Sequence, residues 1–200
     1  NFFYFILFFF ISINLLLFYK FKKNILINLD KYSIFLFFIF LLTSIVLAHD
    51  LFFSHDVRLY WFERVVLFYN DYFVNEYATY KKEYPHYGTF LWAFFWKNNL
   101  INLEYFGRLI YIFIYLLSIG SVVSIFENNI KIKLLITLII LFLTFQMKYF
   151  DGRQDILLFS FNLFISRFLY DLIIKKENIA INLFLITLII NLLIWTKQEG

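Results

Sequence analysis

Residues 48–88 read AHDLFFSHDVRLYWFERVVLFYNDYFVNEYATYKKEYPHYG and interrupt an otherwise apolar chain. This stretch carries acidic, basic and histidine side chains, whereas blocks rich in Phe, Ile and Leu lie before and after it. In a membrane protein, such a polar interruption is where water, charge and reactive groups can meet. The stretch therefore decides how the apolar blocks are connected and where function is sought.

Hydrophobic residues make up 62% of the 200 residues, which exceeds the roughly 45–50% of soluble globular domains. The apolar blocks are long enough to cross about 30 Å of hydrocarbon. We therefore expect an all-α fold, a polytopic transmembrane helical bundle with about six spans. We expect these spans at residues 2–18, 32–48, 109–126, 134–147, 156–174 and 179–195.

The chain has no initial Met and stops directly after an apolar block. We interpret residues 1–200 as a single membrane domain, a fragment of a longer protein. The absence of cysteine excludes disulfides, thiolate metal sites and cysteine nucleophiles. The net charge of +4 is small and the sequence has no basic patch outside the loops, so we expect no nucleic-acid partner.

Short loops that carry lysine are typical of the cytoplasmic side of a membrane protein. Three such loops alternate with the expected spans, so that all three fall on one side of the membrane. Residues 49–107 then form one large extracytoplasmic loop, for which we expect interfacial helices. The lysines of the three loops are Lys20, Lys22, Lys23, Lys31, Lys131, Lys133, Lys175 and Lys176.

Within the large loop, apolar residues recur at three- and four-residue steps, which predicts an amphipathic helix lying in the interface. Ser54 could cap this helix, which would place Asp56 in its first turn. Residues 89–96 are apolar but too short to cross the membrane. We expect them to dip into the bilayer with Trp92 and Trp96 at the headgroup level. The apolar positions of the predicted amphipathic helix, which precedes residues 89–96, are Leu59, Phe62, Val66 and Tyr69.

Two acidic pairs fall on the predicted extracytoplasmic side: Asp50 with Asp56, and Asp151 with Asp155. A carboxylate near the bilayer can act as a general base, because partial desolvation raises its pKa. The alternative is that these residues are ordinary acids of solvated loops.

Three cations lie close to these acids in the sequence: Arg58, Arg153 and Lys197. A guanidinium fork or an ammonium could bind a lipid phosphate, and the alternative is snorkelling at the interface. Inside an expected span, Arg167 and Asp171 lie four residues apart and could neutralise each other. We interpret that pair as structural.

Three histidines, His49, His55 and His86, share the large loop with several acids. Their spacing matches no zinc signature, so a zinc site is the weaker interpretation. Aromatic residues of the loop could stack on sugar faces or anchor the chain at the interface. These residues are Tyr60, Trp61, Tyr84 and Tyr87.

Four short motifs resemble those of GT-C membrane glycosyltransferases, a superfamily that includes protein mannosyltransferases and aminoarabinose transferases. They are the run from His55 to Trp61, the run from Glu83 to Gly88 with its Tyr-Pro pair, the acidic run from Phe150 to Asp155, and Thr-Lys-Gln-Glu-Gly at 196–200. Val57 stands where many members of the superfamily carry a second acidic residue.

This resemblance implies a glycosyltransferase that moves a sugar, with inversion, from a polyprenyl-phosphate donor to an unknown acceptor outside the cytoplasm. Asp56 would be the catalytic base and Asp155 would assist it. The implied substrate-binding residues are Arg58, Arg153, Lys197, Glu199 and Tyr84. No cofactor is implied, and a divalent metal is possible but not required.

The resemblance also implies an integral, multi-pass protein of a bacterial inner membrane, with the lipid bilayer as a partner. Two other classes of function stay open. A multi-pass transporter or lipid flippase would line a path through the bilayer with charges, although broken helices and inverted repeats are not visible. A structural or assembly subunit would tolerate replacement of the acidic loops.

Overall fold

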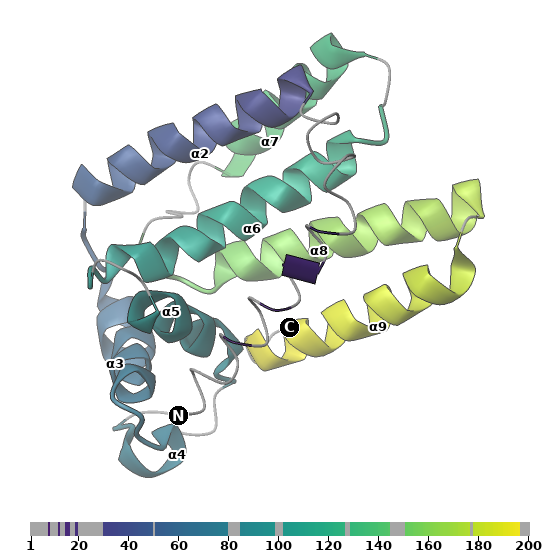
Figure 1. Cartoon of the computed structure of the whole chain (residues 1–200). Coiled ribbons are helices and arrows are strands. Elements are labelled where there is room, and N and C mark those ends of the chain that lie inside the picture. Colours follow the sequence, from purple (N-terminus) through teal and green to yellow (C-terminus); the bar gives the residue numbers. More distant parts are fainter. Residues whose placement is uncertain are drawn as a thin grey trace.

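The computed structural model shows a bundle of helices (Figure 1). Every regular element within the described residues is a helix, which confirms the all-α class. The structure describes residues 8, 12, 15, 16, 19, 30–49, 51–79, 85–98, 102–126, 129–144, 151–176 and 178–196.

Four helices are long and apolar enough to cross a membrane, which indicates a membrane protein. They are α2 (Lys31–His49), α6 (Tyr105–Val123), α8 (Asp155–Tyr170) with its continuation η3 (Asp171–Lys175), and α9 (Ile179–Thr196). At about 1.5 Å per residue each rises about 27–32 Å, close to the thickness of a bilayer core.

These helices match four of the six expected spans. The expected span at residues 134–147 overlaps α7 (Ile130–Thr144), a 15-residue helix that is not among those four. The expected span at residues 2–18 lies outside the described residues, apart from isolated positions. The structure therefore supports four spans, and the count of six stays a prediction.

Successive long helices run in opposite directions (Figure 1). In this view α2 and α7 lie above α6, followed by α8 and then by α9 at the lower edge. The start of α2 meets the middle of α7, where Tyr32 and Thr137 share a hydrogen bond of 2.7 Å. We call this the lysine end, because it carries Lys31, Lys131, Lys133, Lys175 and Lys176.

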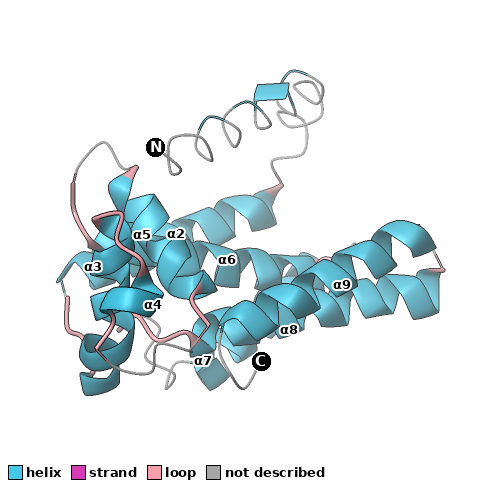
Figure 2. Cartoon of the chain, turned by 90° about the horizontal axis from the view of Figure 1, so that it is seen from below, coloured by secondary structure: helices cyan, strands magenta, loops and turns pink. Residues whose placement is uncertain are grey.

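The opposite end, which we call the cap end, is formed by residues 51–79 and 85–98 and by the first turns of α6 and α8. Short helices gather there, as both views show (Figure 1, Figure 2). They are η1 (Val57–Phe62), α3 (Glu63–Tyr69), α4 (Val74–Tyr77) and α5 (Tyr87–Lys97).

The helix predicted from Leu59, Phe62, Val66 and Tyr69 forms, but a different face of it is buried. Those four positions are half-buried, whereas Val57, Trp61, Arg64 and Val65 are fully buried. The buried positions also follow one another at steps of four and three residues, so they form a second face of the same helix, which begins with the π-helical turn η1. Ser54 is buried at the start of this helix, but its hydroxyl forms no hydrogen bond, so the predicted side-chain cap is wrong.

Candidate functional site

The centre of the cap end is Trp92 on α5, which is completely buried. Two glycines let the backbone approach its ring. A Cβ atom would lie 2.4 Å from the ring at Gly107 and 2.6 Å from it at Gly152. Gly152 also has a φ of +88°, which side chains adopt only with strain. The loop before α8 therefore packs directly on Trp92, which is enclosed by protein, and its predicted position at the headgroup level stays a prediction.

A buried ion pair lies beside this tryptophan. The Arg108 guanidinium, which is 1% exposed, donates two hydrogen bonds of 3.0 Å to the Glu104 carboxylate. It also lies over the Phe53 ring, with 4.5 Å between Cζ and the ring centroid. Burial raises the pKa of Glu104, while the positive charge of Arg108 opposes that rise. The pair anchors the start of α6 to the segment between α2 and η1.

A chain of hydrogen bonds joins three further segments. The Tyr111 hydroxyl on α6 donates to the Gly88 carbonyl oxygen at 2.8 Å and accepts from Gln154 Nε2 at 2.9 Å. A Cβ atom at position 88 would lie 1.4 Å from Gln154 Oε1, so only glycine leaves room for this amide. The chain fixes the loop before α8 against both α5 and α6.

The two predicted catalytic acids lie in segments that this network brings together. A Cβ atom at Gly152 would come within 3.1 Å of Val57 Cγ1, so the loop carrying Asp151 touches the residue after Asp56. Asp56 is exposed in the first turn of its helix, and Asp155 is half-buried in the first turn of α8. The structure thus places the two acidic motifs, which lie far apart in the sequence, at neighbouring helix starts.

The predicted cations at this surface also have local partners. Arg58 Nε donates to the Phe53 carbonyl oxygen at 3.2 Å, and its guanidinium lies 5.4 Å from the centre of the Phe52 ring. Arg153 Nε lies 2.9 Å from Asp151 Oδ2, in a pair whose carboxylate is buried and whose guanidinium is 36% exposed. Both guanidinium groups reach the surface beside the acidic segments.

Four other predicted site residues cannot be placed. Tyr84, Lys197 and Glu199, together with Asp50 of the first acidic pair, lie outside the described residues. The hypothesis of a zinc site gains no support from the part of the chain that the structure describes, where no group of three His, Asp or Glu side chains could hold a metal ion.

Sequence reasoning missed the buried network itself. Glu104 and Arg108 lie four residues apart at the start of an apolar run, a spacing that could have indicated an ion pair on one helix face. Gly107 and Gly152 could have indicated close packing. No comparable signal in the sequence indicated that Trp92 lies against both glycines.

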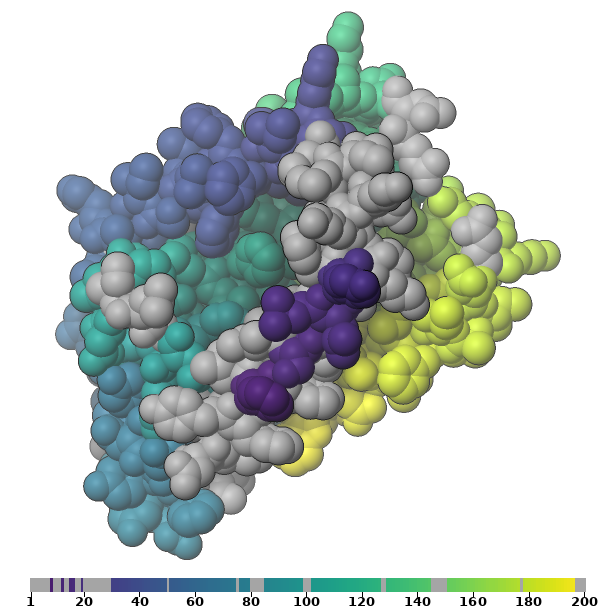
Figure 3. Space-filling view, viewed as in Figure 1, coloured from purple at the N-terminus to yellow at the C-terminus, as the bar shows by residue number. Residues whose placement is uncertain are grey.

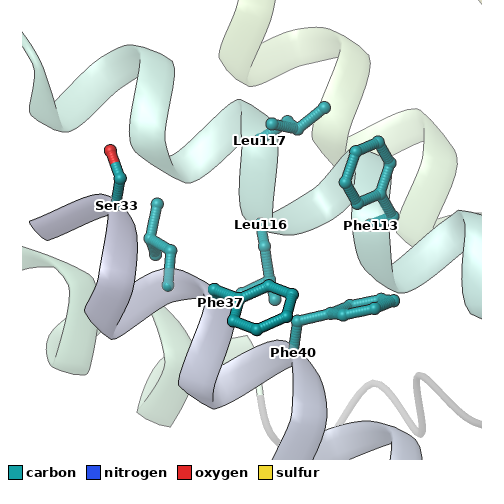
Figure 4. Close-up of a pocket in the computed structure, with 7 residues that line it drawn as sticks. Ser33, Phe37, Phe40, Phe113, Leu116 and Leu117 are labelled. Carbon is teal, nitrogen blue, oxygen red and sulfur yellow. The ribbon is translucent and has the colours of Figure 1, made fainter. Parts of the chain in front are cut away.

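Away from the cap end, an apolar groove of about 230 Å³ lies between α2 and α6 (Figure 4). Phe37 and Phe40 of α2 face Phe113 and Leu117 of α6 across it. Such a lining suits a hydrocarbon chain. None of the predicted acids lines this groove.

The predicted ion pair is present where α8 continues into η3. Arg167 Nε lies 2.9 Å from Asp171 Oδ2, and the two side chains are 15% and 16% exposed. Each charge therefore has its partner on the same helix, close to the lysine end.

No protein-family model, no curated protein and no solved structure matches this chain. The residues of the cap end are therefore the basis of the functional proposal.

Proposed function

We propose that this chain belongs to a membrane glycosyltransferase that moves a sugar from a polyprenyl-phosphate donor to an acceptor hydroxyl at the cap end. The observation that supports this proposal best is the contact between Gly152 and Val57, which brings the segments of Asp56 and Asp155 together. A transferase of this type needs a base for the acceptor and cations for the phosphate at one membrane surface.

In the proposed reaction, Asp56 takes the proton of the acceptor hydroxyl as its oxygen attacks the anomeric carbon. The bond between that carbon and the phosphate oxygen breaks, and polyprenyl phosphate leaves with the electron pair, so the configuration is inverted. Arg58, Arg153 and Lys197 stabilise the phosphate charge. Asp155 orients the acceptor, and Tyr84 and Glu199 contact the substrates.

The packing of the cap end suits this role. Trp92, Arg108 and Gln154 are buried and fixed beneath the acidic segments, whereas Asp56 is exposed. A rigid layer beneath exposed reactive groups holds them in a defined geometry, which catalysis requires. The groove between α2 and α6 offers an apolar surface to the hydrocarbon tail of a lipid donor.

A transporter or lipid flippase is the second candidate. The observation that favours it is the Arg167–Asp171 pair inside a helix that could cross the membrane, because such charges often mark transport pathways. If the protein is a transporter, neutralising both charges would abolish movement of its substrate. In that case neither the parent protein nor any variant would transfer sugar.

The decisive test replaces Asp56 with Asn in the full-length protein. Membranes receive a polyprenyl-phosphate hexose labelled in the sugar, and label appearing in protein or glycolipid is measured. We expect transfer to fall by about 10²–10⁴-fold, because a general base contributes on that order.

Asp71→Asn is the matched control. Asp71 is an exposed carboxylate of the same loop, paired with Lys97 at 2.7 Å, and we expect its replacement to leave transfer unchanged. Normal transfer by Asp56→Asn, with both variants inserted at equal amounts, would refute the base assignment.

A further inference from the structure

The segment directly before α8 holds one arginine among buried neighbours. Asp151 and Gln154 are 4% and 1% exposed, and Gly152 lies against the Trp92 ring. Arg153 stands between them, and its side chain is 36% exposed. The segment lies at the cap end, which occupies the lower left of the space-filling view, where the blue residues of α3 and α4 lie (Figure 3). The segment is therefore a fixed support from which one cation reaches the surface.

The Asp151 carboxylate holds Arg153 at two points. Its Oδ1 accepts from the Arg153 backbone N–H at 3.1 Å, and its Oδ2 lies 2.9 Å from Arg153 Nε. The first contact fixes the backbone, and the second fixes the direction of the guanidinium. Among the described residues no third side chain pairs with this guanidinium. The contact at Nε therefore leaves the N–H groups of the terminal nitrogens to a ligand.

Holding an arginine in this way has a benefit and a cost for anion binding. An arginine side chain carries about 2 kcal/mol of rotamer entropy, which it loses when it binds a ligand. A partner that already orients the side chain removes part of that loss. The negative charge of the same partner, however, repels an approaching anion. Orientation and charge therefore predict opposite effects when the Asp151 carboxylate is removed.

We propose that Asp151 is a positioning residue that directs the Arg153 guanidinium at the phosphate of the lipid donor. This inference rests on the proposed function, which assigns Arg153 to that phosphate. An oriented fork of N–H groups can meet two phosphate oxygens at once, and it stabilises the charge that develops as the bond to the sugar breaks. Asp151 acts only through the arginine, because its own side chain is buried and engaged with residue 153.

Asp151→Asn in the full-length protein tests this role. Asparagine keeps an oxygen for the Arg153 backbone N–H but loses the carboxylate that holds Nε. We expect decaprenyl phosphate to bind about 3- to 10-fold more weakly in detergent micelles, the range for about one net hydrogen bond, with a matching rise in KM for the sugar-loaded donor. Decaprenol, which lacks the phosphate, should bind the parent and the variant equally. Unchanged or tighter binding of decaprenyl phosphate would overturn the proposal.

A second background separates positioning from a purely structural role. When Arg153 is already replaced by Ala, Asp151→Asn should weaken binding no further, because both changes remove the same interaction. A structural Asp151 would weaken binding in both backgrounds, which would overturn the proposal. The matched control is Asp71→Asn, which also removes a paired carboxylate of the cap end, 2.7 Å from Lys97. We expect this control to bind decaprenyl phosphate like the parent.

Arg153→Lys tests the same inference with Asp151 intact, and it serves where Asp151→Asn does not fold. Lysine keeps the positive charge but lacks the planar fork, so we expect weaker binding of decaprenyl phosphate. Binding equal to that of the parent would contradict the role of orientation. If the parent protein transfers no sugar, the proposed function fails, and the binding of decaprenyl phosphate still decides this inference.

Discussion

The two ends of this bundle satisfy their polar groups in different ways. At the cap end, the buried Arg108 bonds Glu104 of its own helix and lies over the Phe53 ring, and the buried Gln154 bonds Tyr111 of another helix. At the lysine end, Asp30 bonds Ser33 three residues away, and both are exposed. The cap end therefore depends on a connected set of contacts between distant segments, whereas the lysine end combines exposed local pairs with one buried long-range bond, between Tyr32 and Thr137.

The largest expected effect concerns Trp92. Its replacement by Ala leaves a cavity beneath the loop before α8 and should lower the free energy of unfolding by about 3–5 kcal/mol. The control is Phe142→Ala on α7, since Phe142 is 80% exposed and its loss should cost about 0.5 kcal/mol or less. Unfolding by a denaturing detergent, followed by circular dichroism, measures both. Equal losses would show that the cap end is not more tightly packed.

A smaller effect is expected from glycine replacements in α6. At Gly107 a Cβ atom would lie 2.4 Å from the Trp92 carbonyl oxygen, which is backbone and cannot move freely. Gly107→Ala should therefore destabilise the protein by about 1–3 kcal/mol.

Gly120→Ala is the comparison in the other half of the same helix. Its Cβ atom would meet only the end of the Leu36 side chain, at 2.9 Å. The gain in helix propensity, about 1 kcal/mol, should offset that contact and leave the stability nearly unchanged. Thermal unfolding in detergent measures the stability of both variants. A greater loss of stability for Gly120→Ala than for Gly107→Ala would contradict the prediction.

Two tyrosines test the polar contacts of each end. Tyr111→Phe leaves the buried Gly88 carbonyl and the Gln154 amide without a partner, which should cost about 1–3 kcal/mol. Tyr32→Phe should cost less, because the Thr137 hydroxyl keeps its bond to the Lys133 carbonyl oxygen at 2.8 Å. Chemical unfolding of both variants gives the difference, and a larger loss for Tyr32→Phe would contradict it.

The smallest effect concerns Asp30, which caps α2 by accepting from the Ser33 backbone N–H at 2.8 Å. Asp30→Ala should cost about 1 kcal/mol at neutral pH. The side-chain and backbone hydrogen bonds of Ser33 hold the pKa of Asp30 below its ordinary value of 3.8. The stabilisation is therefore complete above that ordinary value and is lost as the pH falls through the lower, folded-state pKa. Stability measured from pH 6 downward should show the two proteins converge, and a constant difference would argue against the cap.

The features that depend on local composition could be predicted from the sequence. The apolar blocks predicted α2, α6, α8 and α9, and the spacing of Arg167 and Asp171 predicted their ion pair. Lysine in short loops predicted which turns would share an end of the bundle. Which side of a membrane that end faces stays a prediction.

The cap end could be predicted only in part. The polar residues indicated a functional region that includes Asp56 and Asp155. The burial of Trp92, in contrast, follows from the approach of two glycines that are distant in the sequence. Such contacts depend on tertiary packing, which spacing along one helix does not reveal. The role of Arg108 could not be predicted for the same reason, since its partners include Phe53 from the segment before η1.

The widened turn η1 gives this helix a place that can lose a residue. A π-helical turn takes up one residue more than an α-helix needs for the same rotation, so deleting one residue from Val57–Phe62 would restore ordinary winding and leave the later side chains on nearly the same faces. Arg64, now completely enclosed, would stay inside. The same deletion within Glu63–Tyr69, which is ordinary α-helix, would instead turn every side chain after it by about 100°.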